Sequence, residues 1–298
     1  MKFAVIDIGS NTAKAEIYKY KNNALKLKLK EVRRDMIADH KDGGSLDSDG
    51  VSILINIMKE FALICRQNEV EKIFPYATQS LRGIDNADEV LRMIRAATGF
   101  NVEIISGEEE ARLCFDAFKC EHGALSGALS DMGGGSTEIT LFDCGKVEKS
   151  ESVPFGSRSL VHALGIDTIP DTEQEKKIRK MIDDYAEQYR LSCAKGSLYA
   201  CGGTSSGMFR LLSEKAGGKV SYASVDTLYD FYAYCKSDIK KAAETALLLT
   251  SDRYDTVYTG LFAHICLCEA IGCRTVRLCK STCRRGYAEK LIKNGYVK

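Results

Sequence analysis

The chain has 298 residues, of which 45% are hydrophobic, and its 42 Lys and Arg nearly balance its 41 Asp and Glu, for a net charge of +1. This length suits two domains of ordinary size, and the balanced charge argues against a general surface for duplex nucleic acid or for membranes. The sequence lacks an apolar run long enough for a transmembrane helix, and Asp7 comes too early for a secretory signal. We therefore expect a cytoplasmic protein.

The apolar pattern predicts strands alternating with helices, and the pattern restarts near residue 125. The first part has strands at 2–8, 14–20, 25–32, 71–78 and 101–106 and helices at 47–70, 86–99 and 106–120. The second part has strands at 125–131, 136–142, 146–153, 197–201 and 274–279 and helices at 171–190, 204–215, 238–250, 254–271 and 283–294. This order favours α/β layers.

The restart predicts two domains with related beginnings, at 1–124 and 125–298. The segment "EHGALSG" (121–127) is the expected junction. A packing of the C-terminal helix against the first domain is compatible with this division.

The 12 cysteines include no C-x-x-C pair, and the closest groupings are Cys266-x-Cys268 and Cys279-x3-Cys283. These spacings do not match common zinc or iron–sulfur sites. We therefore interpret the cysteines as reduced, mostly buried apolar residues. The four histidines form no H-x-x-x-H pair, so a histidine-rich metal centre is not expected.

Two similar phrases, "VIDIGSNTAK" (5–14) and "LSDMGGGSTEI" (129–139), open the two predicted domains. In each, a strand ends at an aspartate, Asp7 or Asp131, and leads through glycines into another strand. Glycine permits a positive φ and close approach to a ligand, and successive N–H groups with Ser or Thr hydroxyls bind anions. A carboxylate beside a phosphate requires a divalent cation, which predicts Mg²⁺ (or Mn²⁺).

An ordinary glycine-rich hairpin with a turn aspartate is the alternative for either phrase alone, and the duplication favours a phosphate site in a cleft between two domains. A third glycine turn, "YACGGTSSG" (199–207), follows a strand and opens a helix, so it predicts either a further phosphate site or only a strand end. The chain contains no G-x-x-x-x-G-K-[ST] loop.

The duplicated hairpins resemble the phosphate loops of the actin, sugar kinase and heat-shock ATPase superfamily. "VEIISGEEEARL" (102–113) together with "DMGGGSTEITL" (131–141) resembles one family more closely, the exopolyphosphatase / guanosine pentaphosphate phosphatase (Ppx/GppA) family, in its short two-domain form. The resemblance also covers "ATQSLRGIDNAD" (77–88), "SVPFGSRSL" (152–160), "CGGTS" (201–205) and "DRYDTVYTG" (252–260). It implies two actin-like (ribonuclease H-like) domains.

Three consecutive glutamates begin the helix predicted at 106–120. Ser106 and Glu109 have the spacing of a capping box. Glu108 lies in the first turn, where its negative charge interacts favourably with the helix dipole, and we expect it to face solvent. At 100° per residue, Glu110 falls on the inward arc with Leu113. A carboxylate there is either an arc-edge glutamate that reaches water or a general base that orients water. The resemblance implies the second role, because the family's base precedes Ala-Arg.

The expected site residues follow from the phrases and the resemblance. Metal ligands are Asp7, Asp131 and Glu138, of which Glu138 is either the family's motif glutamate or an exposed strand residue. Phosphate-binding residues are Gly9, Ser10, Asn11, Thr12, Lys14, Arg82, Gly133, Gly134, Gly135, Ser136, Thr137, Gly203, Thr204 and Arg253. Lys14 stands where the family usually has arginine and so lacks the bidentate fork, and Arg285 replaces an acid.

The predicted reaction is Mg²⁺-dependent hydrolysis of the terminal phosphoryl of inorganic polyphosphate, with Glu110 orienting the water. The shared motifs leave open the 5′-phosphohydrolysis of guanosine pentaphosphate (pppGpp). A kinase of the same superfamily and a non-catalytic polyphosphate or nucleotide sensor also remain as alternatives. The resemblance is compatible with a homodimer, although the sequence reveals no interface.

Overall fold

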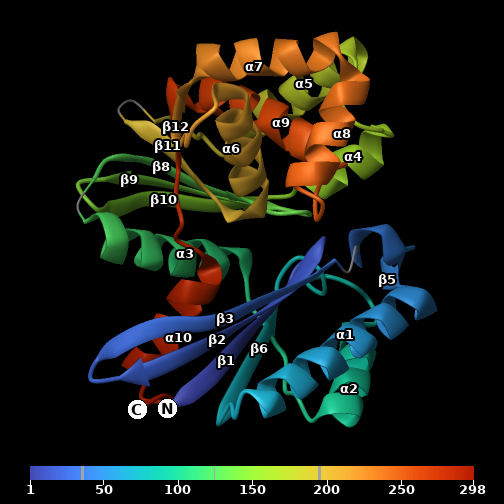
Figure 1. Cartoon of the computed structure of the whole chain (residues 1–298), viewed down its shortest axis with the longest axis vertical. Helices are drawn as coiled ribbons and strands as arrows, with labels where there is room; N and C mark the ends of the chain where they lie inside the picture. The colour runs from blue at the N-terminus through green and yellow to red at the C-terminus, as the bar shows by residue number, and fades with distance from the viewer. Residues whose placement is uncertain (35–36, 124, 194–195) are drawn as a thin grey trace. The chain divides into compact units, whose positions relative to one another are not determined.

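The computed structural model describes residues 1–34, 37–123, 125–193 and 196–298. The chain divides into two compact units (Figure 1). Unit 1 consists of Met1–Cys114 and Cys283–Lys298, and unit 2 consists of Phe115–Thr282. The division falls inside helix α3 (Gly107–His122), earlier than the predicted boundary, and residue 124 at that boundary lies outside the described residues. The C-terminal helix α10 (Cys283–Lys293) belongs to unit 1.

Unit 1 contains a five-stranded sheet in the order β3-β2-β1-β6-β7. Its strands are β1 (Lys2–Ile8), β2 (Thr12–Lys21), β3 (Ala24–Arg34), β6 (Lys72–Ala77) and β7 (Glu103–Ile104). The three N-terminal strands pair antiparallel, and β6 and β7 add parallel to β1. A 3-10 turn (Ile37–His40) and the hairpin β4 (Lys41–Asp42) and β5 (Ser45–Leu46) precede the first helix.

The alternation of side chains along β1 explains why this sheet carries helices on both faces. Phe3 and Val5 pack in a cluster with α10, whereas Ile6 and Ile8 pack on the opposite face with α1 (Ser48–Gln67) and α2 (Ala87–Thr98). Figure 1 shows α1 and α2 on one side of the sheet and α10 on the other. Asp7 has the parity of Phe3 and Val5, so its side chain lies on the α10 face.

Unit 2 contains a six-stranded sheet in the order β10-β9-β8-β11-β13-β12. Its strands are β8 (Gly127–Met132), β9 (Thr137–Asp143), β10 (Lys146–Val153), β11 (Ser197–Cys201), β12 (Tyr222–Ser224) and β13 (Thr275–Leu278). Its helices are α4 (Ser157–Leu164), α5 (Thr172–Gln188), α6 (Gly202–Ala216), α7 (Val225–Ser237), α8 (Ile239–Leu249) and α9 (Val257–Ile271).

Helix α9 lies at the centre of the helical layer of unit 2 and is buried over most of its length. It contacts α4, α5, α6 and α7, and together with them forms the main core against the even-numbered side chains of β8. The other face of the sheet is covered by the second half of α3, where the Phe118 ring lies 5.1 Å from that of Phe142 and 4.9 Å from that of Tyr199. Figure 1 shows this layering.

The two units share one strand plan. In each, three antiparallel strands are extended by parallel strands on the side of the first strand. The predicted α/β fold class is therefore confirmed, and the shared strand plan agrees with the related beginnings of the two phrases. Among the residues that the structure describes, no helix is long and apolar enough to cross a membrane.

Two helices and several short strands were not predicted. Helix α7 is rich in aromatic and β-branched residues, whose intrinsic helix propensity is low. It is nevertheless capped by Ser224, which accepts a hydrogen bond from the N–H of Thr227, and it buries Leu228 and Phe231. Helix α4 has only eight residues and lies within "SVPFGSRSL", too short for a periodic pattern. Tertiary burial, rather than local propensity, stabilises both helices.

The packing of α10 in unit 1 predicts a site that is intolerant of a methyl group. A Cβ added to Gly286 would lie 1.9 Å from the backbone oxygen of Leu113 in α3. We expect Gly286→Ala to lower the free energy of unfolding by about 1–3 kcal/mol through overpacking. Gly218→Ala is the matched control, because an added Cβ there meets nothing within 4 Å. Urea denaturation of both variants measures the effect, and equal stabilities would contradict the close helix contact.

Candidate functional site

The two glycine hairpins close with the same internal hydrogen bond. In unit 1 the N–H of Gly9 donates to the carbonyl oxygen of Thr12 at 3.3 Å, and in unit 2 the N–H of Gly133 donates to that of Ser136 at 2.9 Å. We predicted that these glycines permit a positive φ, and this is wrong, since neither has one. The hairpins instead fold tightly, because an added Cβ would lie 3.0 Å from the Thr12 oxygen and 3.2 Å from the Ser136 oxygen.

Asn11 at the tip of the first hairpin has an unusual environment. Its side chain is 5% exposed, and neither Oδ1 nor Nδ2 has a hydrogen-bond partner among the described residues. A buried amide that makes no hydrogen bond costs roughly 1–3 kcal/mol per group. Bound water or a ligand with both acceptor and donor capacity would satisfy it. Ser10 and Thr12 beside it are also buried, so the tip presents a desolvated polar surface.

Asp7 lies near the end of β1, the central strand of the unit 1 sheet, with one partner residue on each neighbouring strand. Lys14 is directly opposite it on β2, and Tyr76 is its partner on β6. Arg284 from α10 donates to Asp7 Oδ2 at 2.6 Å. One carboxylate oxygen of Asp7 is therefore held by a guanidinium, while both strand neighbours contribute polar groups to the same face.

Arg284 also holds a second, fully buried carboxylate. Its Nε donates to Glu16 Oε1 at 3.0 Å, and the Tyr18 hydroxyl donates to Glu16 Oε2. Burial alone would raise the pKa of Glu16, but the charge of Arg284 and the hydrogen bond from Tyr18 outweigh it and hold that pKa below its ordinary value. Burial would likewise lower the pKa of Arg284, and the two carboxylates raise it. Both groups are therefore charged in the interior of unit 1.

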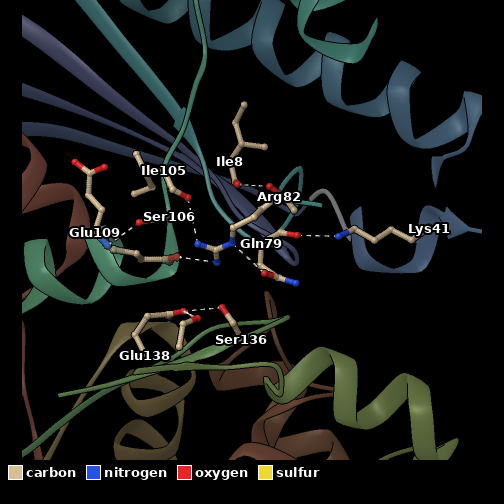
Figure 2. A network of polar contacts seen from close by, with 12 residues as sticks. Ile8, Lys41, Gln79, Arg82, Ile105, Ser106, Glu109, Ser136 and Glu138 are labelled. Atoms are coloured by element: carbon tan, nitrogen blue, oxygen red, sulfur yellow. Dashed lines mark hydrogen bonds and ion pairs between the residues drawn. The ribbon is translucent and has the colours of Figure 1, made fainter. Parts of the chain in front are cut away.

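Glu110 lies at the start of α3 with its side chain 13% exposed, which agrees with the inward arc predicted for it. Its Oε2 is 3.4 Å from Nη2 of Arg82. The same guanidinium donates to Gln79 Oε1 and to the carbonyl oxygen of Ile105, each at 3.1 Å (Figure 2). Three acceptors fix the orientation of Arg82, so the guanidinium forms a rigid support for the carboxylate of Glu110.

Lys41 is a cation in this region that sequence analysis missed. Its Nζ donates to the carbonyl oxygen of Gln79 at 2.8 Å, and Arg82 donates to the side-chain oxygen of the same residue (Figure 2). Burial and the charge of Arg82 lower the pKa of Lys41. The positive charges of Lys41 and Arg82 repel each other, and an anion near both would relieve this repulsion. No motif surrounds Lys41, and only its placement beside residues 79–82 reveals it.

The predicted capping of α3 is confirmed in part. The Ser106 hydroxyl accepts from the N–H of Glu109 at 3.0 Å. The Glu109 carboxylate pairs with Lys290 of α10, so it joins two helices of unit 1. Glu108 is exposed, as predicted.

In unit 2, Asp131 and Glu138 lie directly opposite each other on β8 and β9. Side chains so paired lie on one face with Cβ atoms about 4.5–5.5 Å apart. Glu138 is not the exposed strand glutamate of the alternative interpretation. It is 3% exposed, and its Oε1 accepts from Ser136 Oγ at 2.8 Å (Figure 2). The same oxygen accepts from Ser152 Oγ, also at 2.8 Å.

Residues 155–159 of the same unit contact the rest of the second hairpin. The carbonyl oxygen of Gly134 accepts from the N–H groups of Arg158 and Ser159, and Gly156 lies so close that a Cβ would be 2.5 Å from Gly134 C. The Thr137 hydroxyl donates to the carbonyl oxygen of Phe155 at 2.7 Å. The Thr137 hydroxyl is thus occupied within unit 2, and the predicted phosphate-binding role of Thr137 stays a prediction. Gly135 lies half-buried in the same loop.

The third glycine turn opens a helix, as predicted. Gly202 begins α6. Its φ is 85°, a value that only glycine adopts readily. An added Cβ on Gly203 would lie 2.3 Å from Nη2 of Arg253, so this predicted arginine lies against the turn. Arg253 pairs with Asp252 at 2.7 Å. Thr204 is buried, with its hydroxyl 3.2 Å from that of Ser157.

The three predicted metal ligands are carboxylates, the hard oxygen donors that Mg²⁺ and Mn²⁺ prefer. Asp131 and Glu138 form an adjacent pair within unit 2, and Arg284 binds only one oxygen of Asp7. These residues fit a hard divalent cation. The prediction that Asp7 joins the other two in a cleft concerns the placement of the units and stays a prediction.

The repeated strand plan, the aspartate at each glycine hairpin and the inward glutamate define a duplicated α/β protein whose polar groups suit phosphate chemistry. The sequence model of the Ppx/GppA phosphatase family matches residues 17–294 of this chain. The chain therefore belongs to the Ppx/GppA phosphatase family, as its motifs predicted.

Known relatives agree with this assignment. Exopolyphosphatase 1 of Mycobacterium tuberculosis is 23% identical over 96% of this chain and 87% of its own length. A putative exopolyphosphatase of Haemophilus influenzae is 24% identical over 99% and 93%. The fold is shared with the Aquifex aeolicus Ppx/GppA family member, with a TM-score of 0.80, 21% identity and coverage of 100% and 99%. It is also shared with an exopolyphosphatase from Cytophaga hutchinsonii, with a TM-score of 0.85, 15% identity and coverage of 99% and 98%.

The buried ion pairs of Arg284 predict a pH-dependent loss of stability. Arg284→Met leaves Glu16 charged and uncompensated in the interior, which costs about 3–5 kcal/mol. Because the wild-type pair holds the pKa of Glu16 below 4.5, its stabilisation is complete at neutral pH and is lost as the pH falls through the folded-state pKa. The deficit of the variant should therefore be largest near neutral pH and smaller in acid.

Urea denaturation of both proteins at neutral and acidic pH measures this deficit. Arg285→Met is the control, because Arg285 pairs with Glu289 from a partly exposed position, and such pairs contribute about 0–1 kcal/mol. A deficit for Arg284→Met that is small, or that grows in acid, would contradict the charged state of Glu16.

Proposed function

We propose that the protein is an exopolyphosphatase that removes the terminal phosphoryl of inorganic polyphosphate with Mg²⁺ or Mn²⁺. The observation that carries the proposal is the pairing of Glu110 with Arg82. A mostly buried carboxylate is held at the start of a helix by a guanidinium that three acceptors orient. This arrangement suits a base that acts on water beside a bound anion. The names of the mycobacterial and Haemophilus relatives support the choice of polyphosphate.

In the proposed reaction, Glu110 accepts a hydrogen bond and then the proton from a water molecule. The water oxygen forms a bond to the terminal phosphorus while the bond from that phosphorus to the bridging oxygen breaks. Orthophosphate leaves, and the chain is one phosphate shorter. Positioning and charge neutralisation supply most of the rate in such transfers, and a divalent cation on Asp7, Asp131 and Glu138 would supply part of that neutralisation.

The polar tip of the first hairpin and the cations near residue 79 are the proposed contacts for phosphate oxygens. Asn11 has two unsatisfied amide atoms, and the backbone N–H groups of the glycine turns are natural anion donors. Lys41 and Arg82 add positive charge that an anion would stabilise. Hydrolysis of pppGpp uses the same reacting groups, so substrate preference is decided by the assay and not by these contacts.

The role of Glu110 predicts a large loss of turnover on a conservative change. We expect Glu110→Gln to lower kcat by about 10²–10⁴-fold, because glutamine accepts a hydrogen bond from water but cannot take its proton. Glu108→Gln is the matched control, since Glu108 lies two residues earlier in the same helix and is exposed. Near-normal turnover in Glu110→Gln would remove Glu110 from this role.

Phosphate release is measured with long-chain polyphosphate and with pppGpp, each with Mg²⁺ or Mn²⁺. Release from polyphosphate supports the proposal, and release from pppGpp alone favours the alternative substrate. Release from neither would overturn both. Binding without turnover would instead indicate a sensor, and phosphate transfer to an added acceptor would indicate a kinase.

The lowered pKa of Lys41 predicts a pH effect on substrate affinity. Lysine binds a phosphate only when protonated, so the KM of the wild type should rise in alkali at a lower pH than for an ordinary lysine, whose pKa is 10.5. Lys41→Met should raise KM about tenfold at neutral pH and abolish this alkaline rise. Lys59→Met, at an exposed position of α1, is the control. An unchanged KM in Lys41→Met would exclude a contact with substrate.

A further inference from the structure

We propose that Glu121, His122 and Cys279 in unit 2 form a binding site for Zn²⁺ that is separate from the phosphatase chemistry. Ligand atoms of the three residues lie within 4.8 Å of one another. Glu121 and His122 end helix α3, and Cys279 directly follows strand β13. The two segments are far apart in the sequence, so no short cysteine–histidine spacing marks the site.

The separations suit a tetrahedral zinc ion. His122 Nε2 lies 3.8 Å from Cys279 Sγ and 3.8 Å from Glu121 Oε2. With zinc bonds of about 2.3 Å to sulfur and about 2.0–2.1 Å to nitrogen or oxygen, tetrahedral ligand atoms stand about 3.3–3.6 Å apart. The two separations that involve His122 therefore exceed the tetrahedral spacing by only a few tenths of an ångström, and the Glu121 and Cys279 ligand atoms lie within 4.8 Å of each other. A water molecule would complete the fourth position.

The ligand types select the metal. A thiolate, an imidazole and a carboxylate form a mixed set of soft, borderline and hard donors, which suits Zn²⁺ and disfavours Mg²⁺. Binding releases the thiol proton of Cys279 to solvent, as for other cysteine zinc sites. An entry path exists, because the side chains of Glu121 and His122 are 43% and 36% exposed while Cys279 is buried.

Ser281 supports two of the ligands from the interior. Its hydroxyl donates to Glu121 Oε2 at 2.8 Å, and its N–H donates to Cys279 Sγ at 3.4 Å. A backbone N–H directed at sulfur stabilises the thiolate, and a hydroxyl fixes the carboxylate for coordination. The ring of His122 is held by that of Phe118, with centroids 4.8 Å apart. All three ligands are therefore oriented by neighbouring groups.

The alternation of side chains along the sheet explains how Cys279 reaches α3. Val276 on β13 belongs to the core beneath the helical layer, so residues of odd number at this strand end face the opposite side, which α3 covers. The N–H of Cys279 continues the sheet by donating to the carbonyl oxygen of Ala200 at 2.9 Å. A bound ion would thus join the end of α3 to the end of β13.

The proposal is tested by titrating the full-length, chelator-treated protein with Zn²⁺ against a chromophoric competitor, and with Co²⁺ as a spectroscopic probe. Excess Mg²⁺ is present throughout, so that oxygen-only sites are occupied. We expect one Zn²⁺ per chain in competition with the chelator and a thiolate-to-cobalt charge-transfer band. Cys279→Ser should abolish the band, and His122→Gln and Glu121→Gln should weaken zinc binding at least tenfold.

Three further variants sharpen the test. Ser281→Ala should weaken zinc binding by about 10–100-fold, as loss of a group that orients a ligand does. Cys144→Ser and His162→Gln change an exposed cysteine and an exposed histidine of the same unit, and should leave the binding unchanged.

Absence of the charge-transfer band in the wild type, or equal zinc affinity in the wild type and Cys279→Ser, would overturn the proposal. If Cys279→Ser does not fold, His122→Gln at its solvent-exposed position decides the question by the same two measurements. Zinc should also raise the melting temperature of the wild type and of Cys144→Ser but not that of His122→Gln, and an equal rise in all three would contradict the site.

Discussion

The internal ion pairs of Arg284 are the constraint on which unit 1 depends. Asp7 must sit at the end of a central strand for the glycine hairpin to present it, and Glu16 points from the next strand toward the same covered face. A charge as deeply buried as that of Glu16 is costly unless a cation pairs with it. Arg284 pairs with both carboxylates through one side chain. Because that side chain comes from α10, the last helix of the chain is part of the first unit and orients the first candidate metal ligand.

The two hairpins share a backbone design but differ in charge. The residue opposite the aspartate on the second strand is Lys14 in unit 1 and Glu138 in unit 2. The unit 2 hairpin therefore places two carboxylates side by side, which suits a divalent cation, whereas the unit 1 hairpin places a carboxylate beside two cations, Lys14 and Arg284. A duplicated scaffold thus supplies one hairpin that favours a metal and one that balances positive and negative charge beside an anion.

Local patterns were sufficient for most strands, for the hairpins, and for the inward position of Glu110, because each depends on alternation or helical periodicity within a short window. They were not sufficient where the partners are far apart in sequence. Arg284 meets Asp7, and Cys279 meets His122, only after the sheets and helices assemble. Lys41 acquires its significance from Gln79 and Arg82 in the same way. The division of the chain inside α3 was missed because a continuous helix gives no boundary signal, and α7 was missed because its burial compensates for poor propensity.

The cysteines are free and mostly buried, as predicted, and the proposed zinc site changes the interpretation of Cys279 alone, for a physical reason. Spacing rules detect zinc sites whose ligands come from one turn or one knuckle, and they are silent when an adjacent pair at a helix end meets a cysteine that follows a strand. In such a case the useful signal is the orientation of the donors, here by Ser281. The sulfur and imidazole ligands also separate this site chemically from the carboxylates of Asp131 and Glu138. Zn²⁺ prefers the former and Mg²⁺ the latter, so the two proposed sites in this unit would not compete for the same ion.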